Sequence, residues 1–529
     1  MPRSVHNALQ AAFALTVLAA HPAAQERIDP DGIAGGLVLV GGGGTPEAAR
    51  ARFVAWAGGD GARIVVVPSA SSRADGDSSG FGDWLEPWQA FGVEELTAVH
   101  PSPDAVREAD RDALRKATGV WFSGGSQSRI AERFVGTVLE DLVLDVVRRG
   151  GVVGGTSAGA AIQSRVMIAQ GREEPAIARG LDLLPGAIVD QHFVARNRIG
   201  RLQKAVAHHP DRFGVGIDEG TAILVRGRRI EVVGASTATL VLAGTERREA
   251  RVQVLHAGDI ADLTALRRAA QNRAGEDFPG PVATKPAVEA GALILVGGGS
   301  LPRPALEQFV ALAGGPQARI VLLPIAAPGS EASLESLAAR CRALGAAEAI
   351  VLSESHPTDV DRDSYLDKIA GATGVWFGGG RQWRFVDAFD GTRALPALRA
   401  VLARGGVIAG SSAGASIQGE YMPRGDPLGN QTVSAEGYER GLGFLPGVAV
   451  DQHLTERNRL PDLVALVRRV PAFVGLGLDE GTALIVRGRT GTVVGRGRVH
   501  VVRAAASPEP EVRAYEAGTS VELSPTGGE

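Results

Sequence analysis

The chain has 529 residues with 44% hydrophobic and 22% charged side chains, which is an ordinary globular balance. Its formal net charge of −4 shows no excess of basic residues of the kind that nucleic-acid-binding proteins have. The single cysteine excludes an internal disulfide, and no cluster of cysteine and histidine has zinc spacing. We therefore expect neither a nucleic-acid partner nor a metal or organic cofactor.

The first 24 residues follow the order of a secretory signal peptide. Arg3 and His6 precede an apolar run at 11–20, and small residues continue to Ala24. The run is too short to cross a bilayer as a mature helix, and no later apolar run approaches membrane length. We expect a signal peptide at 1–24, cleavage between Ala19 and Gln25, and a secreted protein (periplasmic or extracellular) without a membrane anchor. A disordered N-terminal tail is the alternative.

The chain then repeats itself at a long interval. Matched segments occur in the same order in both halves, offset by 255 residues at Gly155 and Gly410 and by 261 at Asp190 and Asp451. A period of this length indicates domain duplication rather than a solenoid. We expect one domain at 35–263, a linker at 264–288 that begins as a helical end, and a second domain at 289–525.

Each copy opens with short apolar segments that end in glycine or proline, at 37–40, 63–67, 119–122 and 151–153 in the first copy. Continuous apolar runs predict strands buried on both faces, as in a parallel sheet. Amphipathic stretches at 46–57, 128–134 and 138–149 separate them. The alternation predicts a doubly wound, three-layer α/β domain with a mainly parallel sheet. Short β segments with Arg-Gly turns after Thr221 predict an appended antiparallel edge.

The strongest local motif is Gly155-Thr-Ser-Ala-Gly159, which follows the predicted strand at 151–153. Gly-x-Ser-x-Gly at a strand-to-helix turn is the nucleophile-elbow pattern, in which small flanking residues let a strained turn close. The following helix supplies N–H groups to an oxyanion. The motif recurs at Gly410-Ser-Ser-Ala-Gly414. A glycine-rich turn with an ordinary capping serine is the alternative interpretation.

A nucleophilic serine needs a base, and two histidine pairs occupy matching positions in the copies. His100 and His356 each precede a proline, which favours a structural role. His192 and His453 each end an Asp-Gln-His triplet directly after a β-like stretch and downstream of an elbow. We interpret this second pair as general bases.

Arginines follow each candidate base: Arg196, Arg198 and Arg201 in the first copy, and Arg457 and Arg459 in the second. Guanidinium groups bind carboxylates bidentately, so the cluster suggests a carboxylate clamp, although a solvated helix face would look the same. The second copy has Asp462 where the first has Arg201, which alters its clamp.

Glycine turns follow two of the predicted strands. In 122–127, and again in 377–382, a Gly-Gly turn faces the crevice at the carboxyl ends of the sheet. Its N–H groups could complete an oxyanion hole and Gln127 could hold a substrate amide or carboxylate, but a plain tight turn fits equally well. The run at 41–44 lacks phosphate-binding spacing and is interpreted as a tight turn.

These motifs together resemble cyanophycinase and its relatives, the serine peptidases that include α-aspartyl dipeptidase. The resemblance covers nearly all of each copy and rests on Gly-Gly-x-Gln, Gly-Thr-Ser-Ala-Gly-Ala, Leu-Pro-Gly…Asp-Gln-His-Phe…Arg-x-Arg-x-x-Arg-Leu and Gly-Ile-Asp-Glu, at 124–127, 155–160, 184–202 and 216–219. It implies a class I glutamine-amidotransferase-like fold with a Ser–His–Glu triad. It also implies hydrolysis of cyanophycin, a poly-aspartate with arginine joined to its side-chain carboxyls, with release of β-Asp-Arg dipeptides.

By this resemblance Ser157 is the nucleophile and His192 the base, and the acid lies on the loop between them at Glu173, with Glu174 as the alternative. The N–H groups of Gly124, Gly125 and Ala158 would bind the oxyanion. The implied substrate-binding residues of the first copy are Gln127, Asp190, Gln191, Arg196, Arg198 and Arg201. In the second copy the implied triad is Ser412, His453 and Asp426, beside Gln382, Asp451, Gln452, Arg457 and Arg459.

Several alternatives stay open from the sequence. The same catalytic set suits an aspartyl dipeptidase or isopeptidase acting on other acidic peptides. An α/β-hydrolase esterase fits less well, because its histidine normally lies much farther from the serine than His192 lies from Ser157. The second copy could be a pseudoenzyme that only binds polymer, or it could complete an internal pseudo-dimer. The expected partner is cyanophycin or another polyacidic peptide.

Overall fold

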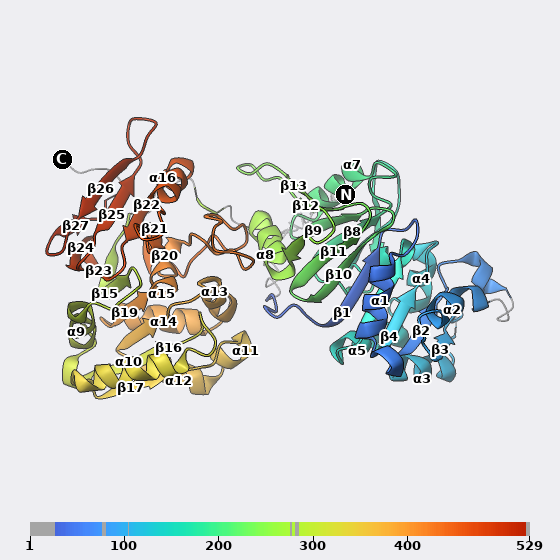
Figure 1. The fold of residues 1–529 in the computed structure, drawn as a ribbon, viewed down its shortest axis with the longest axis horizontal. Helices are drawn as coiled ribbons and strands as arrows, with labels where there is room; N and C mark the ends of the chain where they lie inside the picture. The colour runs from blue at the N-terminus through green and yellow to red at the C-terminus, as the bar shows by residue number, and fades with distance from the viewer. Residues whose placement is uncertain (1–26, 77–80, 104, 276–277, 281–284, 525–529) are drawn as a thin grey trace, which may run out of the picture.

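The structure is a computed structural model that describes residues 27–76, 81–103, 105–275, 278–280 and 285–524. The expected signal peptide at 1–24 lies outside the described residues. Figure 1 shows two α/β domains side by side, with helix α8 (Leu263–Ala274) between them. Within the described part of the chain, every helix is too short or too polar to span a bilayer.

The main sheet of the first domain has eight strands in the order β14-β11-β10-β1-β5-β4-β2-β3. The five strands from β1 to β3 in this order run parallel, while β10, β11 and β14 add an antiparallel edge. The predicted parallel sheet with an antiparallel edge is therefore confirmed. The strands are β1 (Ile33–Val40), β2 (Arg63–Val67), β3 (Glu95–Ala98), β4 (Gly119–Phe122), β5 (Val152–Thr156), β10 (Thr221–Gly227), β11 (Arg229–Gly234) and β14 (Ile260–Asp262).

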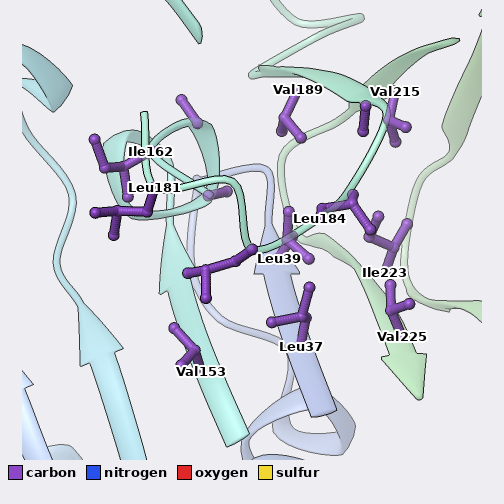
Figure 2. Close-up of a cluster of buried hydrophobic side chains, with 14 of the residues drawn as sticks. Leu37, Leu39, Val153, Ile162, Leu181, Leu184, Val189, Val215, Ile223 and Val225 are labelled. Atoms are coloured by element: carbon purple, nitrogen blue, oxygen red, sulfur yellow. The ribbon is translucent and has the colours of Figure 1, made fainter. Parts of the chain in front are cut away.

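Both faces of this sheet are buried because alternate apolar side chains of each strand point to opposite faces. On β1, Val38 and Val40 pack with Phe53 and Trp88 in one core cluster. Leu37 and its neighbour Leu39 belong to the opposite cluster (Figure 2). Helices α1 (Glu47–Trp56) and α2 (Gly82–Gln89) cover the first face. The second is covered by α3 (Glu108–Lys116), α4 (Gln127–Phe134), α5 (Val138–Arg148) and α6 (Ala158–Ala161).

A second, four-stranded sheet, which the sequence pattern did not separate from the first, packs beside these helices. Its order is β13-β12-β9-β8, and Val189 and Val215 of its strands lie in the same core as Leu37 (Figure 2). Helix α7 (Ile199–His208) covers its outer face through Leu202 and Val206. The strands are β8 (Ala187–Gln191), β9 (Phe213–Ile217), β12 (Ala238–Leu242) and β13 (Arg251–Leu255), and a separate hairpin joins β6 (Val166–Gln170) to β7 (Ala176–Arg179).

The second domain repeats this architecture with sheets ordered β17-β16-β18-β19-β15-β23-β24-β27 and β20-β21-β22-β25-β26. It has no counterpart of the β6–β7 hairpin among the described residues. A long loop at 422–444 joins β20 to β21 in its place.

The strands of the second domain are β15 (Val288–Val296), β16 (Arg319–Leu323), β17 (Glu348–Val351), β18 (Gly374–Phe377), β19 (Val407–Ser411), β20 (Gly419–Tyr421), β21 (Leu445–Gln452), β22 (Val474–Leu478), β23 (Thr482–Gly488), β24 (Thr490–Gly495), β25 (Val499–Arg503), β26 (Glu511–Tyr515) and β27 (Ser520–Glu522). Its helices are α9 (Arg303–Leu312), α10 (Glu331–Ala343), α11 (Pro357–Val360), α12 (Asp363–Gly371), α13 (Trp383–Phe389), α14 (Ala394–Ala403), α15 (Ala413–Ser416) and α16 (Leu460–Arg469).

Helix α8 occupies the first part of the segment expected as a linker. Asp262 caps it by accepting a hydrogen bond from Ala265 N at 2.8 Å, and Leu266 and Ala269 are buried in the core of the first domain. Two of its arginines reach the second domain: Arg268 pairs with Asp387 at 3.2 Å, and Arg273 pairs with Glu436. The helix is therefore both the end of the first domain and part of its contact with the second. The domain limits drawn from the sequence stay predictions.

Candidate active site

Ser157 lies on a strained turn between β5 and α6. Its φ of 53° and ψ of −108° fall in a region that non-glycine residues rarely adopt. The turn closes only because its flanks are glycine: a Cβ on Gly155 would lie 2.3 Å from the carbonyl oxygen of Gly159, and one on Gly159 would lie 2.2 Å from that of Phe122. The geometry agrees with the elbow predicted from the motif.

His192 meets this serine from the second sheet. It directly follows β8, and its N–H donates to the carbonyl of Gly41 at 2.7 Å. Its Nε2 lies 2.8 Å from Ser157 Oγ, so the structure brings the predicted nucleophile and base together. The other matched histidine of the first copy, His100, contacts Ser69 and Asp75 instead.

The carboxylate beside His192 is Glu219, whose Oε1 lies 2.6 Å from the Nδ1 of the ring. A carboxylate at this position only accepts, so Nδ1 carries the proton and Nε2 is left to accept from the serine hydroxyl. The expectation of Glu173 or Glu174 is wrong. Both are exposed in the turn of the β6–β7 hairpin, and Glu174 pairs with Lys204.

Topology explains this correction. Strands β8 and β9 are parallel neighbours, with Gln191 opposite Ile217, so the residues that follow them meet at the same sheet edge. His192 follows one strand and Asp218-Glu219 follows the other. The repeat of Asp218-Glu-Gly-Thr-Ala222 in the second copy was the signal in the sequence that pointed to this glutamate.

The glycine run at 41–44, interpreted from sequence as a plain turn, makes room for the histidine and its carboxylate. A Cβ on Gly42 would lie 2.3 Å from His192 Cε1, and one on Gly43 would lie 2.6 Å from Glu219 Cβ. Both glycines have positive φ, at 104° and 66°. The run is thus part of the site, because only glycines leave space for the side chains of His192 and Glu219.

A cleft of about 750 Å³ opens in front of Ser157 and His192. Its lining includes the predicted residues Gln127, Gln191, Arg196, Arg198 and Arg201 together with Gly124 and Gly125. Gln127 donates its side-chain amide to the carbonyls of Ile168 and Ala169 at 2.9 and 2.8 Å. Only its oxygen is left for a ligand, so Gln127 can accept from a substrate amide but cannot hold a carboxylate.

The arginines of this cleft have different roles. Arg201 is buried and binds Asp190 through two hydrogen bonds, the Nε one at 2.7 Å, so it neutralises a carboxylate that is itself 1% exposed. Arg198 donates to Gln191 O at 2.6 Å, and burial lowers the pKa of Arg198, although Asp190 opposes that effect. Arg196 is exposed and has no ion-pair partner among the described residues. Arg196 and Arg172, which is likewise exposed and lines the cleft, are therefore the guanidinium groups best placed to bind a ligand carboxylate.

Asp218 holds the segment that carries these arginines. Its Oδ1 accepts from the N–H groups of Val194 and Ala195 at 3.0 and 2.9 Å, and Oδ2 accepts from the Ser236 hydroxyl at 2.7 Å. Burial acts to raise the pKa of Asp218, but these donors outweigh it and the pKa lies below its ordinary value. Asp218, which sequence reasoning left without a role, is thus a positioning residue.

Of the residues expected to bind the oxyanion, Gly124 and Ala158 border Ser157, and Gly125 follows Gly124 in the same turn. A Cβ on Gly124 would be 3.6 Å from Ser157 Cβ, so this turn borders the nucleophile. Gly125 has φ of 142° and packs on the carbonyl of Ala70, a position closed to a side chain. Ala158 begins α6, and its N–H has no partner within the helix. These N–H groups could receive a negatively charged oxygen formed at Ser157.

The second domain has the same array. Ser412 has φ of 56° and ψ of −114°, its Oγ lies 2.8 Å from His453 Nε2, and His453 Nδ1 lies 2.5 Å from Glu480 Oε1. The expectation of Asp426 as the acid is wrong, because Asp426 closes a local turn by accepting from Leu428 N at 2.9 Å. Burial lowers the pKa of His453, which Glu480 opposes.

The substrate side of the second array differs. Gln382 donates to the carbonyls of Pro423 and Arg424 as Gln127 does in the first domain. Asp451 is buried but pairs with Arg424 from the long loop at 3.2 Å, and Arg424 also binds Asp462 at 2.7 Å. Arg424 thus supplies the charge that Arg201 supplies in the first copy. Of the other predicted residues, Arg459 donates to Gln452 O at 2.9 Å and Arg457 is exposed.

A larger cavity, of about 1030 Å³, lies between the two domains. It is lined by residues of both copies, among them Arg248, Phe278, Leu428 and Glu436. The described residues that line it include no histidine, so they form no serine–histidine pair. The chemistry of the molecule is therefore assigned to the two triads.

Comparison with known proteins agrees with this geometry. The model of Peptidase family S51 matches residues 37–233 and 293–494. A cyanophycinase of Geminocystis herdmanii is 37% identical over 203 residues, which are 36% of this chain and 73% of that protein. A cyanophycinase of Trichormus variabilis is 37% identical over 204 residues, 36% of this chain and 66% of that protein. The crystal structure of a peptidase from an acI-B1 actinobacterium is 23% identical, with a TM-score of 0.33, and covers 44% of this chain and 98% of that one.

Proposed function

Because the chain belongs to peptidase family S51 and is a serine-type peptidase, we propose that it degrades cyanophycin through an acyl-enzyme on Ser157 and releases β-Asp-Arg dipeptides as an exopeptidase. The observation that carries the proposal is the Ser157–His192–Glu219 array at the floor of a cleft lined by arginine and glutamine. The substrate is inferred from the cyanophycinases that the chain resembles.

The proposed reaction is ordinary acyl transfer. His192 Nε2 takes the proton of Ser157 Oγ as that oxygen attacks the scissile carbonyl carbon, and Glu219 holds the ring and stabilises its positive charge. The N–H groups of Ala158 and Gly125 receive the oxyanion. The tetrahedral intermediate collapses, the amine leaves with the proton from His192, and a water activated by the same nitrogen hydrolyses the ester.

The charges of the cleft support this class of substrate. An arginine joined to an aspartyl side chain through its amino group keeps a free carboxylate and a free guanidinium. Exposed Arg196 suits the carboxylate. The side-chain oxygen of Gln127 suits an N–H donor, because its own amide group is already bound to the backbone at 168–169.

The test is release of β-Asp-Arg from cyanophycin by the mature protein, by Ser157→Ala, by Ser412→Ala and by the double variant. We expect Ser157→Ala to remove most of the release and the double variant to remove all of it. Equal release by the double variant and by Ser412→Ala alone would overturn the assignment of Ser157 as the nucleophile. If the wild type leaves cyanophycin intact but hydrolyses other aspartyl peptides in a Ser157-dependent manner, the peptidase assignment holds and the polymer is replaced by an aspartyl or isoaspartyl peptide.

We also propose that the protein is exported, which is supported by the order of basic, apolar and small residues at 1–24. The polymer would then be met outside the cytoplasm. Fractionation of the producing cells, with N-terminal sequencing of the mature chain, should find the protein in the periplasm or medium and starting between Ala19 and Gln25. A cytoplasmic protein that retains Met1 would contradict export without affecting the chemistry.

A further inference from the structure

We infer that the second domain is a second hydrolytic centre, and that arginines of the first domain hold the substrate-binding wall of this second site in place. The inference rests on the proposed function for the class of substrate. It starts from the second triad, which is complete in geometry. Ser412 and His453 both have left-handed backbone angles, with φ of 56° and 52°, as Ser157 and His192 have. Such strain is found where chemistry needs it.

The wall of the second site is the loop at 422–444. Gln382 binds the carbonyls of Pro423 and Arg424, and Arg381 binds those of Asp426 and Gly429, the latter at 2.6 Å. These bonds connect the loop to the Gly-Gly turn that precedes α13. The loop therefore takes the place beside the second triad that the β6–β7 hairpin takes beside the first, where residues 169–172 line the cleft.

The other end of this loop is bound to the first domain. Glu436 accepts from Arg273 of α8 and lies 3.3 and 3.4 Å from Arg248 and Arg251, while Glu439 lies 2.7 Å from Arg248. Burial acts to raise the pKa of Glu436, but the arginines, Arg273 foremost, hold it below its ordinary value. The carboxylate is thus largely shielded from solvent, ionised and dependent on cations from the other domain.

The backbone of the loop also touches α8 at this point. Gly437 has φ of 95°, and a Cβ there would lie 2.5 Å from the carbonyl oxygen of Ala265. The contact admits no side chain, so the loop is held at backbone distance from the first domain.

Helix α13, which follows the Gly-Gly turn of the second site, is held in the same way. Helix α13 begins directly after Gln382, and its Asp387 accepts from Arg228 of the first domain at 2.8 Å. Tyr438 of the loop donates to the same carboxylate at 2.7 Å and accepts from Arg228 at 2.8 Å. The guanidinium of Arg228 lies 4.5 Å from the centroid of the Trp383 ring. Helix α13 and the loop at 422–444 are thus tied to one arginine of the first domain.

The first site has no such dependence among the described contacts. Its hairpin is held within its own domain, where Arg179 binds Glu140 of α5 at 2.7 Å. The arginines that reach the second domain lie before β1 (Arg27), on the β10–β11 turn, at and near β13 and on α8, and none of them lines the cleft at Ser157. Removing one of them should therefore affect the second site and spare the first.

The experiment measures each site alone, the second in Ser157→Ala and the first in Ser412→Ala, with Arg273→Ala added to each. For the second site we expect KM to rise about tenfold with a smaller change in kcat, because a displaced wall weakens binding more than chemistry. Kinetics of the first site should stay within twofold of their starting value. Glu436→Gln should reproduce the effect and Arg273→Lys should restore part of it. Arg148→Ala, on the exposed surface of the first domain, is the matched control.

Labelling of Ser412 by a fluorophosphonate in the Ser157→Ala protein measures the second triad without any peptide substrate. No labelling in the folded protein would overturn the claim of a second hydrolytic centre. Labelling without cyanophycin hydrolysis in this variant would exclude the polymer as the substrate of the second site but leave the centre. In that case an aspartyl peptide is tested for its ability to protect Ser412 from the label. The loss of this protection with Arg273→Ala measures the displacement of the loop at 422–444. Equal losses at both sites with Arg273→Ala, or no loss at either, would overturn the role of the first domain, and thermal melting identifies a variant that has simply unfolded.

Discussion

Ser157 and His192 both keep backbone angles that cost free energy. Their φ values of 53° and 48° lie in the left-handed region, where a non-glycine residue costs about 1–3 kcal/mol. The surrounding structure holds them: Ser157 N donates to Val40 O at 2.8 Å and His192 N to Gly41 O at 2.7 Å. Two consecutive carbonyl groups at the end of β1 thus hold the backbones of Ser157 and His192. This strand of the main sheet therefore positions the two side chains for their 2.8 Å contact.

Glu219→Gln tests the third member of the array. In the Ser412→Ala background we expect kcat of the first site to fall by about 10²–10⁴-fold, because an amide cannot stabilise the imidazolium and can enforce the wrong tautomer. Glu173→Gln is the matched control and should leave kcat unchanged, since Glu173 lies in an exposed turn. A larger loss with Glu173→Gln than with Glu219→Gln would contradict the assignment.

The second site should keep its activity at lower pH than an ordinary histidine allows. Burial lowers the pKa of His453, Glu480 opposes this, and Arg457 adds to the lowering. The base must be neutral to take a proton, so a lowered pKa extends the neutral form toward acid. In Ser157→Ala, the acidic limb of kcat/KM should have its midpoint below about 6.5, the ordinary histidine value. Arg457→Ala should move that midpoint upward, and a midpoint above 6.5 in the parent would refute the prediction.

At the scale of elements, a turn without side chains connects the two sheets. The turn at 41–44 follows β1, and the side chains of His192 and Glu219 pack onto it from β8 and β9. The main sheet supplies the nucleophile and the second sheet supplies the base and acid. Their junction therefore tolerates no Cβ at Gly42.

Gly42→Ala should abolish activity at the first site while the protein still folds. The added methyl would lie 2.3 Å from His192 Cε1, so the ring has to move away from Ser157. Gly44→Ala is a matched control, because Gly44 has a similar φ of 114° but nothing within 4 Å of the new Cβ. Both variants carry the same backbone strain, and only Gly42→Ala displaces the base. Equal activity losses in the Ser412→Ala background would show that backbone strain, not the histidine, is responsible.

Helices α7 and α16 place opposite charges at matching positions, Arg201 and Asp462. Arg201→Ala leaves Asp190 buried without its bidentate partner, and breaking such a pair costs about 3–5 kcal/mol. We expect a clear drop in the melting temperature. Arg196→Ala, at an exposed position of the same segment, should leave melting unchanged and raise KM. The opposite pattern would mean that Arg201 is the ligand-binding group and Arg196 the structural one.

At the scale of the whole molecule, the two copies meet through different surfaces. The first contributes α8 and the β10–β11 turn, and the second contributes α13 and the loop at 422–444. In these pairs the first copy supplies the arginines and the second supplies the carboxylates. The contact is therefore heterologous, as expected when a duplicated gene product no longer needs two-fold symmetry.

Separating the domains should harm the second more than the first. Without the first domain, the carboxylates of Asp387, Glu436 and Glu439 lie together with no cations from the other copy. We expect the isolated second domain to melt at a lower temperature than it does in the intact chain, and the isolated first domain to keep its melting temperature and its activity. Calorimetry of both pieces and of the whole chain measures this. An unchanged second domain would contradict a stabilising role for the contact.

The sequence by itself determined the duplication, the parallel sheet with its antiparallel edge, the elbow serines and their histidines. These features depend on local patterns: apolar runs, glycines around a strained serine, and matched order in two copies. It misplaced both acids, because proximity along the loop after Ser157 says nothing about which carboxylate reaches Nδ1.

Tertiary structure alone decided three things. The parallel pairing of β8 with β9 brings Glu219 to His192 across 27 residues of chain. The buried pairing of Arg201 with Asp190 turns an apparent clamp residue into a structural one. The contact of Glu436 with Arg273 joins residues 163 positions apart and ties the second site to the first domain. The physical reason is common to all three. Strand pairing and charge burial depend on which residues become neighbours in space, and a single sequence does not reveal those neighbours when they lie far apart along the chain.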